Sequence, residues 1–123
     1  EPWCKLLLAD SESVINELSE YVKKFDGMGV RFVRSCPYFL EILPDGISKG
    51  TAVSEMRKAL KLDDKLLVSA GDYDNDIEML KASDISFCPA DSQPEVKKAA
   101  KYVLSATCNE DAIAEAIEAL SKI

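Results

Sequence analysis

The chain has 123 residues, of which 47% are hydrophobic and 30% are charged, a composition typical of a folded globular domain. Its 22 acidic and 15 basic residues give a formal net charge of −7. This charge argues against a nucleic acid partner, because a phosphate backbone requires a concentrated basic surface. No apolar run approaches the ~20 residues of a membrane span, so we expect no membrane partner.

The chain contains four cysteines and no histidine. Without histidine, Ser-His and Cys-His catalytic pairs and histidine-ligated metals are excluded. The cysteines form no C-x-x-C pair, although they could make two disulfides in an exported protein. Because the sequence shows no signal peptide, we expect reduced thiols and a cytoplasmic location. The cysteines are Cys4, Cys36, Cys88 and Cys108.

The first part of the chain predicts a strand, a helix and a hairpin. Trp3–Ala9 is dense in apolar residues and short enough for a strand. From Val14 to Phe25, apolar residues recur at helical spacing. Val30–Ser35 and Phe39–Leu43 both have the composition of strands. Since a parallel crossover needs about 12 residues or more, and far fewer separate these strands, they should pair as an antiparallel hairpin.

Pro44, Asp45 and Gly46 form the strongest break in the chain, and we place a domain boundary there, between residues 1–46 and 47–123. After this break, helical and strand patterns alternate. Such alternation predicts a parallel sheet with right-handed crossovers, and therefore an α/β fold. The expected strands are Leu66–Ala70, Ile85–Cys88 and Tyr102–Leu104, and the expected helices lie around Val53, Leu80, Val96 and Ile117.

The last of these helices has both a predicted start and a predicted buried face. Asn109 is the expected N-cap, because an Asn side chain can accept a hydrogen bond from the free N–H groups of the first turn. The apolar residues that follow recur at helical spacing and should face the core. They are Ile113, Ala116, Ile117 and Leu120.

Three carboxylates follow the predicted strand Leu66–Ala70. Gly71 breaks the strand, and Asp72, Asp74 and Asp76 then alternate along the chain. Ligands of open α/β sheets bind outside the carboxyl ends of the strands, and hard oxygen ligands suit Mg²⁺. Because like charges so close repel unless a cation or a base neutralises them, the pattern predicts a magnesium site. A solvated acidic turn that caps the next helix is the simpler alternative.

This acidic segment is not an EF-hand loop. An EF-hand needs glycine at its sixth position and glutamate at its twelfth, where Ile77 and Ser83 stand. Lys49 is the candidate base. A helix N-terminus disfavours a cation, so a nearby phosphate or carboxylate would explain a lysine at this position. Gly50 lets the backbone approach closely, but the segment lacks the spacing of a P-loop.

Two segments carry a resemblance to a known family. Phe39–Thr51, which reads FLEILPDGISKGT, and Gly71–Leu80, which reads GDYDNDIEML, resemble the haloacid dehalogenase superfamily of phosphohydrolases. They are most similar to its Cof-type subfamily, whose members carry an α/β cap. The resemblance continues through Ser92–Ala100 and Asn109–Asp111 and covers nearly the whole chain. It implies a Rossmann-like core with a cap, and Mg²⁺-dependent hydrolysis of small phosphate monoesters through an aspartyl-phosphate.

The resemblance also implies a role for each matched residue. Lys49 would neutralise the phosphate and the nucleophilic aspartate, and Asp72 would ligate Mg²⁺. Asp76 would support the water shell of the metal or the lysine, and Asn75 would form a hydrogen bond near the phosphate. Phosphoryl transfer depends mainly on such positioning and charge neutralisation. Asp91 departs from the family pattern, because an acid replaces the usual Asn of a Gly-Asn-Ala sequence.

The nucleophile of the family is the first acid of an Asp-x-Asp pair at the end of the first core strand. Asp10 is a candidate, with Ser35 as the phosphate-binding hydroxyl, and would make the chain a complete capless phosphatase. However, Ser35 leads directly into a hairpin, whereas the catalytic strands of this fold are parallel. We therefore expect residues 1–46 to be the closing βαββ part of a cap and residues 47–123 to be the second half of the core.

On this interpretation the chain is the C-terminal part of a phosphatase and is inactive alone, because its nucleophile is missing. The chain begins at Glu1 rather than Met, which fits a fragment. Its expected partners are a small phosphorylated metabolite, such as a sugar phosphate, and the missing N-terminal segment. A non-catalytic interaction module is the alternative, because an open sheet edge beside Leu66–Ala70 would recruit another chain or a second copy.

Overall fold

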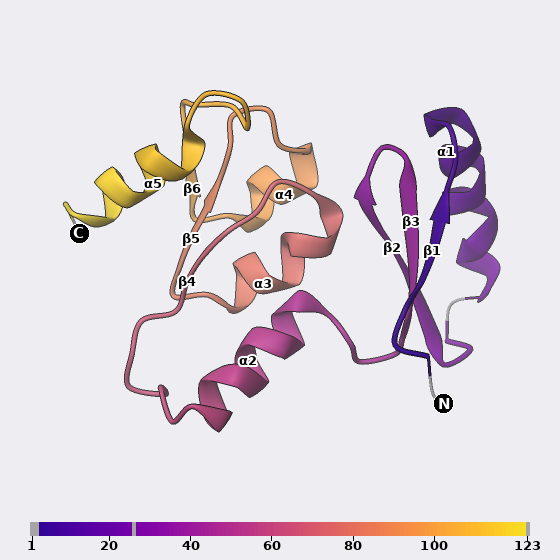
Figure 1. The fold of residues 1–123 in the computed structure, drawn as a ribbon, viewed down its shortest axis with the longest axis horizontal. Helices are drawn as coiled ribbons and strands as arrows, with labels where there is room; N and C mark the ends of the chain where they lie inside the picture. The colour runs from indigo at the N-terminus through magenta and orange to yellow at the C-terminus, as the bar shows by residue number, and fades with distance from the viewer. Residues whose placement is uncertain (1–2, 26, 123) are drawn as a thin grey trace. The chain divides into compact units, whose positions relative to one another are not determined.

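The computed structural model describes residues 3–25 and 27–122 (Figure 1). It divides the chain into two compact units, which are Glu1–Ser48 and Lys49–Ile123. The division falls two residues after the predicted boundary at residue 46. The assignment of these units to a cap and a core stays a prediction.

The first unit is a three-stranded antiparallel sheet with one helix (Figure 1). Its strand order is β1-β3-β2, and both pairings are antiparallel. This arrangement confirms the predicted βαββ pattern, including the hairpin. The elements are β1 (Leu6–Ala9), α1 (Glu12–Tyr21), the 3-10 helix η1 (Val22–Phe25), β2 (Val30–Cys36) and β3 (Phe39–Pro44).

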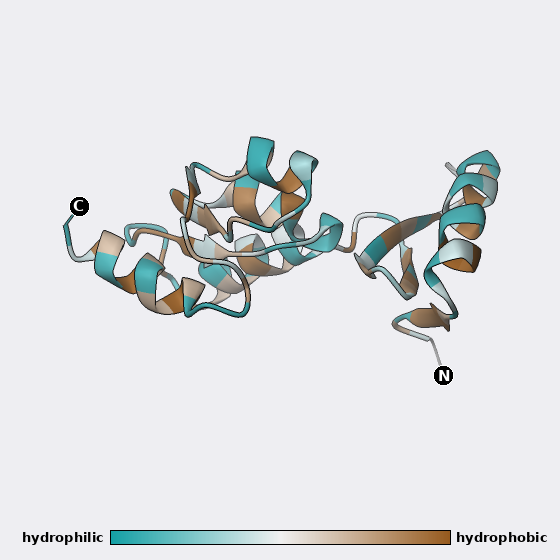
Figure 2. Cartoon of the chain, turned by 90° about the horizontal axis from the view of Figure 1, so that it is seen from above, coloured by the Kyte–Doolittle hydropathy of each residue, from teal (hydrophilic) through white to brown (hydrophobic). Residues whose placement is uncertain are grey.

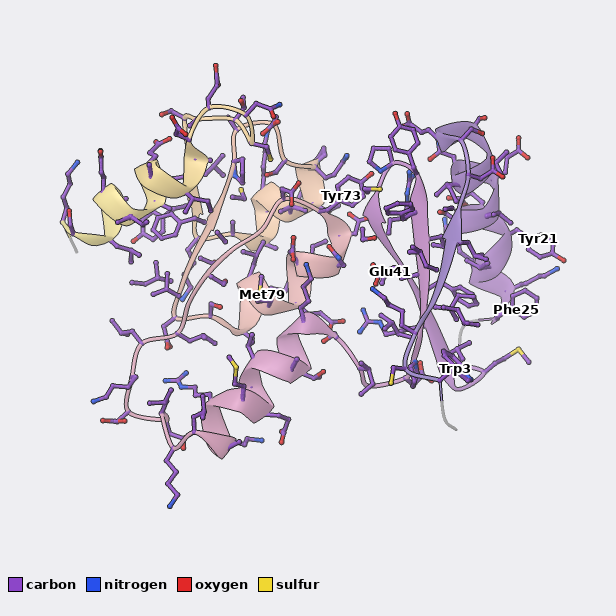
Figure 3. The ribbon with its side chains drawn as sticks, viewed as in Figure 1. Trp3, Tyr21, Phe25, Glu41, Tyr73 and Met79 are labelled. Carbon is purple, nitrogen blue, oxygen red and sulfur yellow. The ribbon has the colours of Figure 1, made fainter. Side chains whose placement is uncertain are left out.

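The core of the first unit lies between the helix and the sheet. Ile15 of α1, Val22 of η1 and Leu40 of β3 are buried together, and Phe25 and Phe32 pack against them. Figure 3 shows Phe25 at the end of the helical segment, with Tyr21 nearby; their ring centroids are 6.0 Å apart in an edge-on arrangement. The helical spacing of the apolar residues therefore places one face of α1 on the sheet.

The second unit contains a three-stranded parallel sheet in the order β4-β5-β6. This sheet confirms the predicted α/β fold. In the described part of the chain, β4 pairs with β5 alone and is therefore an edge strand. The elements are α2 (Lys49–Ala59), β4 (Val68–Ala70), the 3-10 helix η2 (Asp74–Asp76), α3 (Ile77–Ala82), β5 (Ile85–Cys88), α4 (Pro94–Ala99), β6 (Tyr102–Val103) and α5 (Ala112–Leu120).

Strand β5 is buried on both faces, as expected of a central parallel strand. On one face, Phe87 packs in a cluster with Ala112 and Ala116 of α5. On the other face, Cys88 packs with Leu80 of α3 and Val96 of α4. Successive side chains of a strand point to opposite faces, so the pair Phe87–Cys88 joins two cores. Helices thus cover both sides of the strand whose end lies at the candidate site.

The prediction for the last helix was wrong in two respects. Asp111, with a φ of 60°, precedes the helix as its N-cap residue, rather than Asn109. Of the predicted face, Ala116 is buried and Leu120 packs against the core, but Ile113 and Ile117 are 60% and 62% exposed, and Ala112 is buried in their place. Small alanines let α5 lie close to Phe87, and this turns the isoleucines outward. Figure 2 shows the resulting alternation of hydrophobic and hydrophilic residues along this helix.

Two further observations concern the whole of the described chain. Cys4, Cys36, Cys88 and Cys108 are all free thiols. No helix among residues 3–25 and 27–122 combines the length and the apolar character needed to cross a membrane. The cytoplasmic location stays a prediction.

Candidate active site

The candidate site begins where β4 ends. The backbone N–H of Gly71 donates to the carbonyl of Phe87 over 3.2 Å, which extends the pairing of β4 with β5 by one residue. A Cβ atom at position 71 would lie only 2.4 Å from Cβ of Asp76 and 2.8 Å from its Oδ2 atom. The glycine is therefore required by the close approach of the Asp76 side chain to the end of the strand.

Asp76 is the buried centre of the site, with 4% of its surface exposed. Its Oδ1 atom accepts a hydrogen bond from the Lys49 ammonium at 2.6 Å, and its Oδ2 atom accepts from the backbone N–H groups of Asp72 at 3.1 Å and Tyr73 at 3.5 Å. Both carboxylate oxygens are thus engaged. A buried carboxylate needs such partners, because burying an unpaired charge is costly.

A second close approach brings Lys49 to this carboxylate. Lys49 is the first residue of α2, and the next residue, Gly50, is buried against α3. A Cβ atom at position 50 would lie 2.7 Å from the backbone carbon of Glu78. The glycine therefore allows the start of α2 to touch α3. The Lys49 side chain, which is 50% exposed, spans from this contact to Asp76.

These residues open into a cavity of about 830 Å³ at the carboxyl ends of β4 and β5. Lys49, Gly71, Asp72 and Asp76 line its polar side. Its apolar walls include Met79 of α3, which Figure 3 labels, and Ile113 of α5. The cavity has the volume of a small-molecule pocket. It lies at the strand ends, where open α/β sheets bind ligands.

The structure brings Lys49, Asp72 and Asp76 together at one cavity, and their roles in a site stay predictions. Asn75, by contrast, lies half-buried in η2 and is not among the described residues that line the cavity. Asp74 is not among them either, so only two of the three alternating acids reach the cavity.

Asp72 is the acid best placed to ligate a metal. Its side chain is exposed at the cavity, whereas Asp76 is already engaged through both oxygens. Among residues 3–25 and 27–122, no group of three or more acidic or cysteine side chains is arranged to hold a metal. Mg²⁺ retains several waters and takes one or two carboxylates in phosphate-binding sites, so a single carboxylate fits part of such a site.

Cys108 is a site residue that the sequence reasoning missed. Its thiol donates to Oδ2 of Asp72 with a sulfur–oxygen distance of 3.7 Å. Desolvation at the cavity wall, together with the nearby carboxylates of Asp72 and Asp91, raises the pKa of the Cys108 thiol to about 11. The thiol is therefore a neutral donor near pH 7. No motif marks it, since it lies 36 residues from Asp72.

Asp91, the residue that departs from the family pattern, holds the loop that carries Cys108. Its Oδ1 atom accepts the backbone N–H of Cys108 at 2.9 Å, and this hydrogen bond lowers the pKa of the Asp91 carboxyl. An Asn side chain also has an acceptor oxygen at this position. An Asn at position 91 could therefore accept the same hydrogen bond from Cys108.

Asp10, the alternative candidate for the nucleophile, lies beside an antiparallel sheet. Asp10 follows β1, which pairs antiparallel with β3 in the first unit. Its carboxylate accepts hydrogen bonds from the N–H and the hydroxyl of Ser11, at 2.6 and 3.2 Å. Ser35 lies in β2 of the same antiparallel sheet. Neither residue belongs to the parallel sheet of the second unit, which also contains Lys49, Asp72 and Asp76.

The chain is similar in sequence and in fold to known phosphatases and hydrolases. The chain is 34% identical over 83 residues to a phosphoglycolate phosphatase of Methanosarcina acetivorans, covering 68% of this chain and 36% of that protein. It is 33% identical to a haloacid dehalogenase-like hydrolase of known structure from Bacteroides thetaiotaomicron, with a TM-score of 0.71, covering 97% of this chain and 44% of that one. It shares its fold with a sugar phosphatase of HAD subclass IIB, at 24% identity and a TM-score of 0.81, covering 100% of this chain and 45% of that one.

The chain spans less than half the length of the curated relatives it matches. The family model of haloacid dehalogenase-like hydrolases matches residues 1–117, which is nearly the whole chain. The chain therefore belongs to the family of haloacid dehalogenase-like hydrolases.

Proposed function

We propose that the chain is the C-terminal part of a Mg²⁺-dependent phosphatase of the Cof type, which hydrolyses small phosphate monoesters. The observation that carries the proposal is the Lys49–Asp76 pair at 2.6 Å, which opens with Asp72 into a cavity at the strand ends. The shared fold with a sugar phosphatase supports sugar phosphates as the substrate class.

Each residue has a distinct part in this proposal. Asp76 holds the Lys49 ammonium and the backbone of the Asp72–Tyr73 turn, so its role is to position the lysine rather than to touch the metal directly. The Lys49 ammonium faces the phosphate and neutralises its charge. Asn75 is proposed to form a hydrogen bond near the phosphate, although it is not among the described residues that line the cavity.

Asp72 is the proposed metal ligand of this chain. Its exposed carboxylate offers the hard oxygen that Mg²⁺ prefers. When bound, the ion would supply positive charge to the phosphate oxygens. The remaining ligands would come from water, from the substrate and from outside this chain.

The nucleophile of the reaction is proposed to lie outside this chain. Residues 1–46 correspond to the closing βαββ part of a cap, and residues 47–123 to the second half of the core. The antiparallel sheet of the first unit supports this division, because a catalytic strand of this fold would be parallel. The chain alone is therefore expected to be inactive.

Two alternatives have different support. A capless phosphatase that uses Asp10 would need β1 in a parallel core, but β1 pairs antiparallel with β3.

An interaction module has a specific observation in its favour. Val68 of the edge strand β4 and Leu66, which precedes the strand, are 38% and 70% exposed, and this suits association with a missing N-terminal segment or with a second copy.

The test of the proposed function is p-nitrophenyl phosphate hydrolysis with Mg²⁺ by the protein extended upstream of Glu1 in its reading frame. We expect the upstream sequence to contain an apolar strand that ends in Asp-x-Asp-Gly, and the extended protein to turn over the substrate. Lys49→Ala and Asp72→Asn should each abolish turnover. An extended protein that folds but remains inactive, or one indifferent to both substitutions, would contradict the proposal.

A further inference from the structure

We propose that Asp91 and Cys108 form a positioning pair that fixes the orientation of the Asp72 carboxylate. The inference rests on the proposed function, in which Asp72 ligates Mg²⁺. It assigns a role to two residues that lie outside the two sequence segments carrying the lysine and the acids.

The first step is the contact between Cys108 and Asp72. The Cys108 thiol donates to Oδ2 of Asp72 at 3.7 Å, a long distance that is normal for the large sulfur atom. Asp72 is exposed at the cavity, where an unrestrained carboxylate would rotate freely. A donor on Oδ2 restricts this rotation and leaves Oδ1 available to a metal ion.

The second step is the anchoring of the loop that carries Cys108. Asp91 accepts the Cys108 backbone N–H at 2.9 Å, and the Ala90 N–H donates to the Ala106 carbonyl at the same distance. Upstream in the loop, the Glu115 carboxylate accepts the N–H groups of Ser105 at 3.0 Å and Ala106 at 2.8 Å. The loop is thus tied to the segment that follows β5 and to α5, beside the cavity.

These two steps form one chain of contacts, from Asp91 through Cys108 to Asp72. Partners that orient a metal ligand typically change metal affinity about 10-fold or more when they are removed. Because the effect passes through Cys108, losing Asp91 and Cys108 together should cost little more than losing Cys108 alone. This lack of additivity distinguishes positioning from two independent structural effects.

The experiment is a Mg²⁺ titration of the protein extended upstream of Glu1 in its reading frame, followed through the backbone amide signals of Gly71 and Asp72 in ¹H–¹⁵N NMR spectra. Cys108→Ala and Asp91→Ala should each weaken the apparent Mg²⁺ affinity about 10-fold. Cys108→Ser keeps a donor and should recover part of this loss. Asp91→Asn keeps the acceptor oxygen and should bind Mg²⁺ as tightly as the unchanged protein does. Well-dispersed spectra confirm that each variant is folded.

Two further variants complete the design. The double variant Asp91→Ala/Cys108→Ala should bind no more than about 2-fold more weakly than Cys108→Ala alone. Asp72→Asn should abolish the saturable shifts. If Asp72→Asn abolishes them while Cys108→Ala leaves the affinity unchanged, the positioning pair is wrong and the metal role of Asp72 stands. If the unchanged extended protein and its Asp72→Asn variant respond alike, the metal role itself is wrong, and the positioning role is wrong with it.

Discussion

Each unit of this protein contains a largely buried acid paired with a half-exposed lysine, but the two pairs stand in different surroundings. In the first unit, Glu41 contacts Lys5 at 3.2 Å, and in the second, Asp76 contacts Lys49 at 2.6 Å. The side chains of Glu41 and Asp76 are only 11% and 6% exposed. The chemistry of the two pairs is similar, so the residue types alone do not define a site.

The difference lies in what surrounds each acid. Glu41 projects from the middle of β3, between Leu7 of β1 and Val33 of β2, on the face of the sheet opposite α1 (Figure 3). Asp76 instead accepts two backbone N–H groups at a strand end, where Gly71 makes room for it and a cavity opens. Backbone geometry, more than charge pairing, makes the second pair a candidate site.

The strongest test of this difference is Gly71→Ala. Its new Cβ would meet Asp76 at 2.4 Å, so we expect a loss of about 3 kcal/mol in the free energy of unfolding of the second unit. The control is Gly27→Ala in the first unit, where φ is 81° and nothing lies within 4 Å. It should cost only about 1–2 kcal/mol, the penalty of the left-handed backbone. Urea unfolding followed by circular dichroism measures both, and equal costs would contradict the account.

We expect a smaller difference in the free energy of unfolding between variants of the two acids. Asp76→Ala leaves two backbone donors and the Lys49 ammonium without their acceptor, and we expect it to cost about 2 kcal/mol. Glu41→Ala, the matched control, should cost about 1 kcal/mol or less, because Lys5 is half-exposed and can be solvated. Chemical denaturation of the two variants measures both values. A larger loss for Glu41→Ala would contradict the distinction between the two pairs.

The smallest expected effect concerns pH. Hydrogen bonds from the N–H groups of Ser105 and Ala106 lower the pKa of Glu115 below its usual 4.5. A lowered carboxyl pKa stabilises the folded state above pH 4.5, and this stabilisation is lost as the pH falls through the folded-state pKa. Glu115→Gln should therefore flatten the acid side of the stability profile, measured by thermal unfolding between pH 3 and 7. An unchanged slope would show that this carboxylate does not hold the loop.

Local patterns predicted most of the fold. The apolar runs gave β1 and β5 within a few residues, and the short link between β2 and β3 required their antiparallel pairing. The buried face of the last helix was harder to predict, because its apolar residues recur at helical spacing on more than one face. Ala116 was predicted to face the core, but only the packed structure shows that Ala112, rather than Ile113 or Ile117, joins it in the cluster with Phe87.

The site residues that follow a strand end could be predicted from the sequence. The residues that a distant loop brings to the site could not. Asp72 and Asp76 come directly after β4, and the family resemblance added Lys49. Cys108 contacts Asp72 from a loop that Asp91 and Glu115 also bind, and these contacts join residues far apart in the sequence. Periodicity and spacing carry no information about such contacts.

The central claim is that this chain holds the lysine and metal-binding half of a phosphohydrolase site, without the nucleophile. The most direct measurement is p-nitrophenyl phosphate hydrolysis with Mg²⁺ by the chain alone, next to Asp10→Asn. The account predicts no turnover by either protein. Robust turnover by the chain that disappears in Asp10→Asn would contradict it and would make Asp10 the nucleophile of a complete capless enzyme.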